Sequence, residues 1–299
     1  MSELPPGLHC APLGPGDRAA VTSLWRACEV HDDGEALFTE EDFIVTMQRP
    51  SLDVARHTIG VRAGEALVAQ AVMLGERDVF ACVAPAHRGL GIGRWLLDWT
   101  QAAGRAAGYA VTSQSVSVRN ATAIALLEGD GYDARWSAWI FDVEHARAPD
   151  PPLLPPGYAI RAFVPGSDDR TVHQVTEGAF SEWPEYDPDT FEDWAAETVQ
   201  RPGFAPDQIA LAVRGEEVAG AMVLLDEERG MWVSQLAVVR AHRRRGLAHA
   251  LLAHAFGVSW RAGHRHTGLA TDSRTGARGL YEQVGMTVTR TFAAYAKPL

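Results

Sequence analysis

The segment "VVRAHRRRGLAHALL" (Val238–Leu252) repeats the pattern of "VAPAHRGLGIGRWLL" (Val83–Leu97) from the first half of the chain. Each segment starts on apolar residues, passes through a turn rich in histidine, arginine and glycine, and continues with apolar residues at helical spacing. The central glycines, Gly91 and Gly246, lie 155 positions apart. We interpret each segment as the end of a strand that turns sharply into a helix.

The rest of the chain keeps this spacing, which indicates a duplication. Three further glycine pairs recur at offsets of 155, 154 and 150 positions: Gly108 with Gly263, Gly131 with Gly285, and Gly16 with Gly166. A constant offset of this size indicates two copies of one domain. The proline-rich stretch "HARAPDPPLLPPG" (His145–Gly157) separates them, because proline has no amide hydrogen to give to a helix or a central strand. We therefore expect domains at 1–147 and 148–299.

Within each copy the apolar pattern predicts a mixed sheet with helices on its faces. A short first strand and helical segments precede a β-hairpin, at 57–74 in the first copy and 208–225 in the second. After the arginine-glycine turn come a helix, a strand, a second helix and a closing strand, "WSAWIFDV" (136–143) or "RTFAAYAK" (290–297). Gly108 and Gly263 are expected to end the long helices. The fold class is α/β (α+β).

Composition narrows the classes of function. The 299 residues carry a formal net charge of −11, and no stretch gathers enough Lys and Arg to form a nucleic-acid-binding surface, so nucleic-acid binding is not expected. No apolar run approaches the roughly 18 residues of a membrane span, and the first residues have no signal-peptide pattern. Cys10, Cys28 and Cys82 show no metal-binding spacing and suit reduced thiols. We expect a cytoplasmic protein, monomeric or homodimeric, without a metal.

The arginine-glycine turn has the properties of a diphosphate site. The first amides of a helix have no intrahelical partner and lie at the positive end of its dipole, and glycine lets a phosphate approach the backbone. A P-loop requires a GxxxxGK[ST] motif, which neither copy has. A dinucleotide site requires its glycines early in the domain and an acidic residue after the next strand, and "GLGIG" meets neither condition.

The turns do resemble the R/Q-x-x-G-x-G/A motif of the GNAT acetyltransferases, as "RGLGIG" (Arg88–Gly93) and "RRRGLA" (Arg243–Ala248). A second GNAT motif, N-x-x-A-x-x-L-Y-x-x-x-G-F, resembles "NATAIALLEGDGY" (Asn120–Tyr132). Its one-residue-longer variant resembles "SRTGARGLYEQVGM" (Ser273–Met286). Both motifs occur at the family's spacing in both copies, and the tandem arrangement resembles the mycothiol synthase-like group.

This resemblance implies a binding site for acetyl-CoA, the expected cosubstrate, in a cleft where two parallel strands part. In the second copy it assigns pantetheine contacts to Leu236, Ala237 and Val238, and diphosphate contacts to Arg243, Arg244, Arg245, Gly246, Leu247, Ala248 and His249. In the first copy the matching residues are Ala81, Cys82 and Val83, and Arg88, Gly89, Leu90, Gly91, Ile92, Gly93 and Arg94.

The resemblance also assigns the chemistry to one copy. The family's usual proton donor is a tyrosine that corresponds to Tyr281, whereas the first copy has Leu127 at that place. The second copy is therefore expected to be catalytic and the first non-catalytic, with or without bound acetyl-CoA. The base stays open between Asp226–Glu228 and the acids of "FSEWPEYDPDTFEDW" (180–194), namely Glu182, Glu185 and Asp187, because "MWVSQLAVV" (231–239) contains no carboxylate.

The acceptor is expected to be a small-molecule primary amine that attacks the thioester directly. Acids and aromatic rings suit a cationic amine with an apolar body. The candidate acceptor contacts are Glu182, Trp183, Tyr186 and Trp232. Two other interpretations remain open: a non-catalytic acyl-CoA-binding or scaffold protein of the same fold, and a protein N-acetyltransferase.

Overall fold

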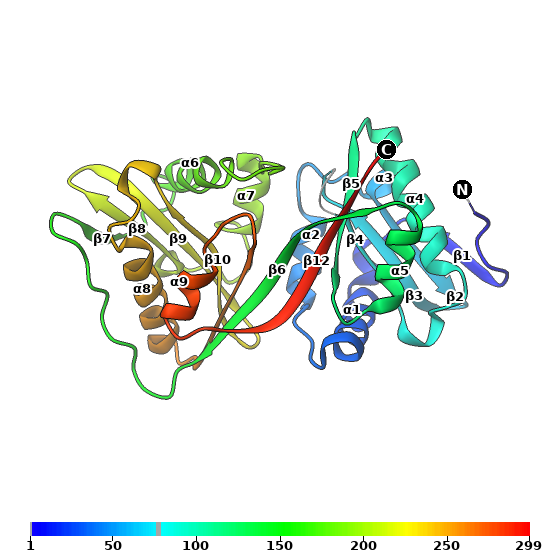
Figure 1. Ribbon diagram of the computed structural model, residues 1–299, viewed down its shortest axis with the longest axis horizontal. Coiled ribbons are helices and arrows are strands. Elements are labelled where there is room, and N and C mark those ends of the chain that lie inside the picture. Colours follow the sequence, from blue (N-terminus) through cyan, green and yellow to red (C-terminus); the bar gives the residue numbers. More distant parts are fainter. Residues whose placement is uncertain (1, 76–78) are drawn as a thin grey trace. The chain divides into compact units, whose positions relative to one another are not determined.

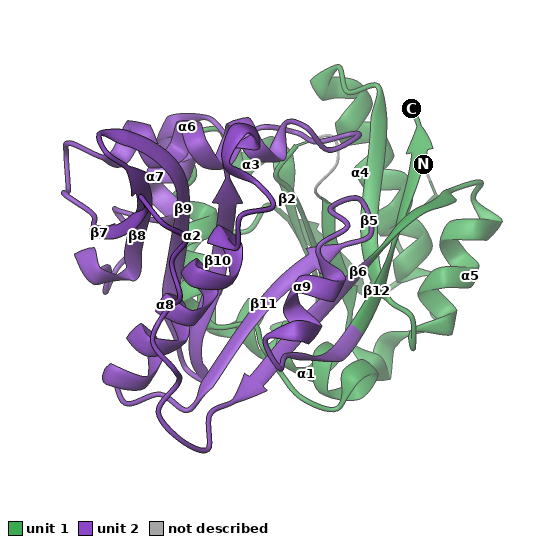
Figure 2. Ribbon diagram, turned by 60° about the vertical axis from the view of Figure 1, so that its left-hand side comes forward, with its two compact units in different colours: residues 1–137, 291–299 green, residues 138–290 purple. Residues whose placement is uncertain are grey.

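The computed structural model describes residues 2–75 and 79–299 (Figure 1). The chain divides into two compact units, residues 1–137 with 291–299 and residues 138–290 (Figure 2). Each unit has strands in antiparallel and parallel pairs, with helices packed on them. The mixed sheet and the duplication predicted from the sequence are confirmed.

The two units do not follow the linear division at residues 147 and 148. Strand β6 (Asp133–Glu144) closes the first copy in sequence, yet its residues 138–144 pair with β11 (His266–Asp272) of the second unit. Strand β12 (Thr287–Pro298) closes the second copy, but from Phe292 onward it pairs with β5 (Val111–Ser117) of the first unit. The copies thus exchange closing strands. The sequence does not reveal this exchange, because the two closing strands have the same length and a similar, partly buried pattern, so either could pair with either copy.

In the first unit, the geometry of two glycines sets the ends of the long helix α4 (Ile92–Ala107). Gly91 precedes this helix with a φ of 87° and Gly108 follows it with a φ of 80°, both in the left-handed region that favours glycine. Besides α4, β5 and the closing strands, the helices and strands of this unit are β1 (Leu8–Ala11), α1 (Arg18–Asp33), α2 (Glu40–Met47), α3 (Val54–His57), β2 (Thr58–Ala63), β3 (Ala66–Met73), β4 (Val79–Val83) and α5 (Ala121–Gly129).

The second unit repeats this order. Gly246 precedes its long helix with a φ of 85°, and Gly263 lies just beyond the helix end with a φ of 94°. Its elements are β7 (Ala159–Ala162), α6 (Asp169–Phe180), α7 (Phe191–Glu197), β8 (Ile209–Arg214), β9 (Glu217–Glu227), β10 (Gly230–Val238), α8 (Leu247–Arg261), β11, α9 (Arg278–Gln283) and the start of β12. Short 3-10 turns cover Pro15–Asp17, Pro85–His87, Pro206–Gln208 and Arg240–His242.

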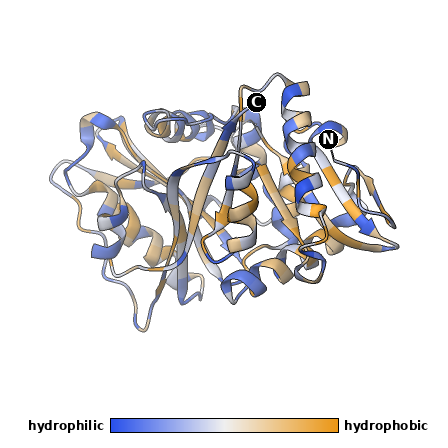
Figure 3. Cartoon of the chain, turned by 45° about the vertical axis from the view of Figure 1, so that its right-hand side comes forward, coloured by the Kyte–Doolittle hydropathy of each residue, from blue (hydrophilic) through white to orange (hydrophobic). Residues whose placement is uncertain are grey.

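The long helices hold the sheets by apolar packing. Ile92, Trp95 and Leu96 of α4 are buried with residues of β2 and β3, and Leu251 and Leu252 of α8 are buried with residues of β9 and β10. Figure 3 shows the apolar colouring along the strands and on helix faces. Burying one such side chain contributes about 2 kcal/mol. This packing fixes the start of each helix beside the end of the preceding strand.

The parallel strands in each unit part toward that end. Strand β10 pairs with β11 over Met231–Val233, whereas its antiparallel pairing with β9 continues to Val238, with a register shift between Val233 and Gln235. In the first unit the parallel pairing of β4 with β5 is at Val79, whereas the pairing with β3 continues to Val83. Each unit therefore presents a strand edge next to its arginine-glycine turn.

Candidate active site

A cleft of about 1080 Å³ opens in the second unit where β10 and β11 part. The end of β10, the last residues of β11, the start of α8, helix α9 and the segment after α6 all line it. Leu236, Ala237 and Val238 lie on its wall, as the sequence predicts for pantetheine contacts. The volume is at the upper end of the range for small-molecule sites, about 300–1000 Å³.

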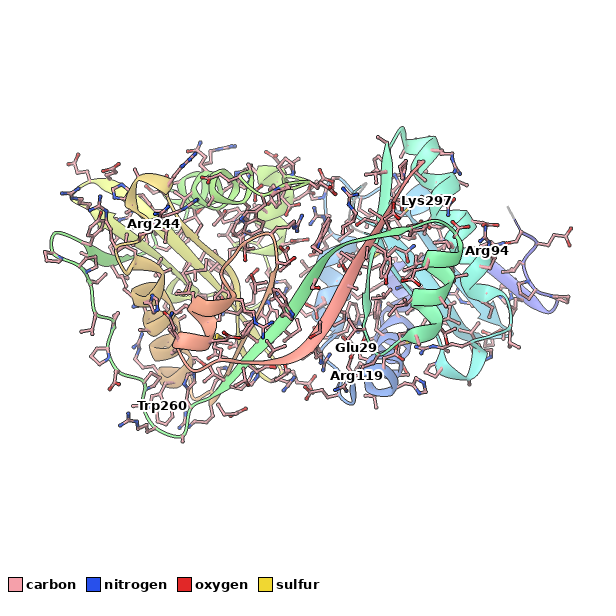
Figure 4. The ribbon with its side chains drawn as sticks, in the orientation of Figure 1. Glu29, Arg94, Arg119, Arg244, Trp260 and Lys297 are labelled. Atoms are coloured by element: carbon pink, nitrogen blue, oxygen red, sulfur yellow. The ribbon has the colours of Figure 1, made fainter. Side chains whose placement is uncertain are left out.

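The turn into α8 forms one end of this cleft. No side chain caps the start of the helix, so its first amides remain available to an anion. Arg244 has a φ of 57°, a left-handed conformation that the first copy fills with Gly89 (φ 77°). Of the residues assigned to the diphosphate, those that line the cleft are Arg243, Arg244, Gly246, Leu247, Ala248 and His249, while Arg245 is exposed outside it. Figure 4 labels Arg244 near the start of α8.

The side chain of Arg243 does not contribute free charge to this turn. Its Nε donates to the carbonyl of Val238 at 2.8 Å, and its two Nη atoms donate to the Glu182 carboxylate at 2.8 and 3.0 Å. The hydrogen bond from Arg243 lowers the pKa of Glu182, so this carboxylate has a lower affinity for a proton and is a poor candidate for the base. Arg243 holds the turn on the end of β10 through its hydrogen bonds.

The first unit repeats this arrangement. Arg88 donates through Nε to the Val83 carbonyl at 3.2 Å and through both Nη atoms to Asp32 at 2.6 and 2.9 Å. Asp32 precedes Glu182 by 150 positions, the offset of the upstream glycine pair. Repetition of the same three bonds in both copies supports a structural role for this arginine.

Tyr281 of α9 lies on the wall of the large cleft and is 7% exposed. Burial raises the pKa of its phenol to about 12, and a hydrogen bond with Thr271 opposes that rise. The ring packs on Phe141 of β6, with centroids 5.5 Å apart. A buried phenol with this pKa stays protonated throughout the physiological range and can donate a hydrogen bond into the cleft. Leu127, its counterpart, is a buried residue of the first unit.

Three aromatic rings form a second wall of the cleft. Phe180 stacks on Trp183 with centroids 4.5 Å apart, and Tyr186 contacts both rings edge-on at 6.0 and 5.8 Å. The Tyr186 hydroxyl donates to the Glu177 carboxylate at 3.0 Å, and burial raises the pKa of this acid. Trp183 and Tyr186 are thus at the cleft, as the sequence suggests. Phe180 was not among the candidate acceptor contacts, although it is the first residue of the segment 180–194.

Arg274 joins this aromatic segment to the far side of the cleft. Its Nη2 lies 2.6 Å from Asp272, and its Nη1 donates to the carbonyls of Pro184 and Glu185 at 3.2 and 3.5 Å. Sequence reasoning missed this residue, because the residues around an arginine do not indicate a partner 90 positions away. The segment that carries Trp183 and Tyr186 is therefore held at two points, by Arg243 and by Arg274.

Trp232 takes no part in this wall. It is absent from the described residues that line the cleft, and its ring lies against Gly268, where an added Cβ would be 2.9 Å from the indole. The expected contact of Trp232 with the acceptor is therefore not supported. Asp226, a candidate base, lies opposite Met231 near the start of β10 and pairs with His264 at 2.9 Å. It is at the end of the strand away from the turn.

The first unit has a smaller cavity, about 330 Å³, at the corresponding place. The expected residues on its wall are Ala81, Cys82, Val83, Arg88, Gly89, Gly91, Gly93 and Arg94. Leu90 is instead 58% exposed, and Ile92 belongs to the core. Arg94 pairs with Asp98 at 3.0 Å and with Asp130 at 2.5 Å, so its charge is balanced. The volume is about a third of that in the second unit.

The described residues contain neither a metal-binding group nor a membrane-spanning helix. Among residues 2–75 and 79–299, no three His, Cys, Asp or Glu side chains gather closely enough to hold a metal ion. Within the same ranges no helix is long and apolar enough to cross a membrane. His264 pairs with Asp226, and His266 pairs with Asp142 at 2.7 Å.

The chain belongs to the acetyltransferase (GNAT) family, because the model of this family matches residues 19–132 and 170–286. The two matches make it a tandem GNAT protein, as the repeated motifs indicated. Among curated relatives, the mycothiol acetyltransferase of Frankia alni is 30% identical over 224 residues, which cover 70% of this chain and 66% of that protein. That of Cellulomonas flavigena is 34% identical over 147 residues, 47% of this chain and 40% of its own. The chain thus spans less than two thirds of either relative.

Solved structures match over nearly the whole chain. A GCN5-related N-acetyltransferase from Sphaerobacter thermophilus is 28% identical, with a TM-score of 0.82 over 99% of this chain and 97% of that one. A tandem GNAT protein from the clavulanic acid biosynthesis pathway has a TM-score of 0.75 over 97% and 98%, at 16% identity. The second likeness concerns the fold alone.

Proposed function

We propose that the second unit transfers the acetyl group of acetyl-CoA to the primary amine of a small molecule by direct attack. The observation that carries this proposal is the meeting, in one cleft, of a free strand edge, an uncapped helix start and the Tyr281 phenol. These three features supply what the reaction needs: a grip on the coenzyme, a fixed donor at the thioester and a donor at the leaving sulfur.

In this proposal the chain binds acetyl-CoA through its backbone. The edge of Leu236–Val238 extends the sheet toward pantetheine, and the amides of the turn from Arg244 to His249 bind the diphosphate. Arg243 keeps the turn in position through Val238 and Glu182. Leu247 contributes its amide alone, because its side chain is buried in the core. The assignment rests on the cleft lining and on the helix start.

Tyr281 stabilises the departing thiolate. An ordinary thiol has a pKa near 8.5, so a phenol with a pKa of about 12 is the weaker acid of the two. It therefore acts mainly as a hydrogen-bond donor to the sulfur as negative charge develops. Such a donor is favourable in a buried site, where it is not competing with bulk water.

The acceptor binds against the aromatic wall of Phe180, Trp183 and Tyr186. Stacked rings favour a cation with an apolar body. The amine must lose a proton before it attacks, and Asp189 and Glu197 are carboxylates on the same cleft. Glu182 and Asp272 line the cleft as well, and their ion pairs with Arg243 and Arg274 give them a structural role at the turn and at the aromatic segment. We assign the base to Asp189 or Glu197, acting directly or through water.

The names of the curated relatives mention a particular acceptor, but we propose only a class of acceptor for this chain. The strand before the turn contains no carboxylate, and the Oε1 atom of its Gln235 accepts a hydrogen bond from Trp194 at 2.9 Å. For this reason the acceptor is assigned only as a small-molecule primary amine. In the first unit, Leu127 provides no donor for the leaving group, so that unit is assigned no turnover.

The test is a free-thiol assay with acetyl-CoA and a panel of aminoglycosides, polyamines, amino acids and glucosamine-inositol. With the best acceptor, Tyr281→Phe is expected to lower kcat by about 100-fold. Calorimetry should show unchanged affinity for acetyl-CoA. Tyr295→Phe is the matched control, since this phenol of the first unit donates to Glu128. Saturable acetyl-CoA binding without turnover on any amine would favour a non-catalytic acyl-CoA-binding protein, and no binding would overturn the proposal.

A further inference from the structure

Two of the three cysteines meet in the cavity of the first unit. Cys28 lies on α1 and Cys82 on β4, and both line the 330 Å³ cavity. The sulfur of Cys28 lies 3.3 Å from the carbonyl oxygen of Val83, the residue that follows Cys82. Cys10 is exposed and lies outside this cavity. The two thiols are 54 positions apart in the sequence, so only the fold brings them together.

The surroundings make the two sulfur atoms unequal. Cys28 donates to the carbonyl of Val83 at 3.3 Å, and Gln70 donates to the Cys82 sulfur at 3.8 Å. The hydrogen bond from Cys82 lowers the pKa of Cys28, burial opposes this, and the Arg88 guanidinium adds to the lowering. Burial raises the pKa of Cys82. One sulfur is therefore the better nucleophile, and the other is a protonated thiol beside it.

We propose that Cys28 and Cys82 form a redox-active dithiol site that reacts with low-molecular-weight disulfides in the cavity of the first unit. The pair combines an activated thiol, an adjacent second thiol and a cavity that gives access to a small molecule, which together characterise reactive dithiols. This site lies in the first unit, so it is separate from the acetyl transfer that we propose for the second unit and uses neither its turn nor Tyr281.

The reaction balances in two exchange steps. The Cys28 thiolate attacks one sulfur of the disulfide RSSR, forming Cys28–S–S–R and releasing RS⁻. Cys82, having lost its proton to that thiolate or to solvent, then attacks the Cys28 sulfur and releases the second RS⁻, which becomes RSH. The two cysteines are oxidised to one disulfide, and RSSR is reduced to two thiols. The new bond joins α1 to β4 at the cavity wall.

The experiment uses the full chain carrying Cys10→Ser, so that the exposed thiol does not contribute. The reduced protein is treated with bis(2-hydroxyethyl) disulfide, quenched in acid and analysed by intact mass and non-reducing peptide mapping. The expected product is lighter by about 2 Da and contains a Cys28–Cys82 cross-link. Wild-type protein, treated in parallel, should show the same cross-link and a mixed disulfide at Cys10.

Two variants in the Cys10→Ser background test the order of events. With Cys82→Ser, a stable mixed disulfide should accumulate on Cys28. With Cys28→Ser, thiolation of Cys82 should be at least about tenfold slower. The proposal is overturned if both thiols stay free after Cys10 of the wild-type protein has reacted fully, or if both form separate mixed disulfides without a cross-link. Both of these outcomes are measured on the Cys10→Ser protein, with the wild-type reaction as the time reference, so they do not depend on whether the Cys82→Ser and Cys28→Ser variants fold.

Discussion

Arg243 and Glu182 form a two-bond ion pair across the mouth of the large cleft, while the same guanidinium bonds to the carbonyl that ends β10. The two side chains are 36% and 37% exposed, so solvent screens the ion pair and its own contribution is small. The bond to Val238 is the stronger constraint, because it fixes the strand end on which the helix start depends.

Separate substitutions distinguish these two contributions. Arg243→Gln is expected to raise the Kd for acetyl-CoA about tenfold, since a charged donor to a backbone carbonyl is lost. Glu182→Gln should change it by less than about threefold. Isothermal calorimetry measures both, and Arg88→Gln in the first unit is the control for loss of an equivalent arginine. Equal effects of Arg243→Gln and Glu182→Gln would show that the ion pair, and not the carbonyl bond, holds the turn.

The raised pKa of Tyr281 is expected to determine how kcat depends on pH. Burial raises its pKa to about 12, so the active, protonated phenol persists as pH rises. We predict that kcat shows no fall from phenol ionisation up to about pH 10, the ordinary tyrosine pKa. Tyr281→Phe should lower kcat by a similar factor at each pH. If kcat of the wild-type enzyme fell between pH 8 and 10 while that of Tyr281→Phe stayed level, the phenol would have a lower pKa than the structure indicates.

The choice of base between Asp189 and Glu197 can be made from the acid limb of the kcat/KM profile. A carboxylate base must be ionised, so activity rises with pH through its pKa. Asp189→Asn and Glu197→Gln remove the charge with little change in shape. We expect one of them to abolish the rising limb and the other to affect only KM. Glu185→Gln, in the neighbouring segment, is the control. Unchanged limbs in both test variants would exclude both residues.

Arg244 is a test of backbone strain in the turn. A residue other than glycine in the left-handed region costs about 1–2 kcal/mol, and the first copy already has Gly89 at this place. Arg244→Gly is therefore predicted to raise the free energy of unfolding by up to about 1 kcal/mol. Arg245→Gly, which removes the same charge at a position without positive φ, should lower it by about 0.5–1 kcal/mol. Denaturant unfolding measures both, and the opposite order would argue against strain at Arg244.

The exchange of closing strands predicts where a truncation acts. A chain that ends at Arg290 loses the β12 residues that pair with β5, including the buried Tyr295. Amide hydrogen exchange should show loss of protection in β5 and retention in β11, which pairs with β6. Tyr295→Ala is the milder companion variant and should weaken the same region. Loss of protection in β11 with β5 intact would mean that the closing strands are not exchanged.

The sequence predicted those features that local pattern controls. The glycine turns, the helix stops at Gly108 and Gly263, and the two hairpins follow from backbone freedom and apolar period, which neighbouring residues set. The position of Tyr281 on the cleft followed from its motif, because a few residues of helix fix which way the side chain points. The resemblance to the GNAT family could also be inferred from the sequence, because the motifs that carry it are short local patterns.

The tertiary structure decided which partners these residues have. The bonds of Arg243 with Glu182 span 61 positions and those of Arg274 with Pro184 span 90, and the sequence around each arginine does not specify its partner. It also placed Trp232 against Gly268 and outside the cleft, put Cys28 beside Cys82, and gave each sheet the other copy's closing strand. Because the chain is duplicated, each closing strand has two nearly equivalent positions, one next to the strands of its own copy and one next to those of the other copy. The choice between them depends on the packing of the whole chain, which a local sequence pattern does not contain.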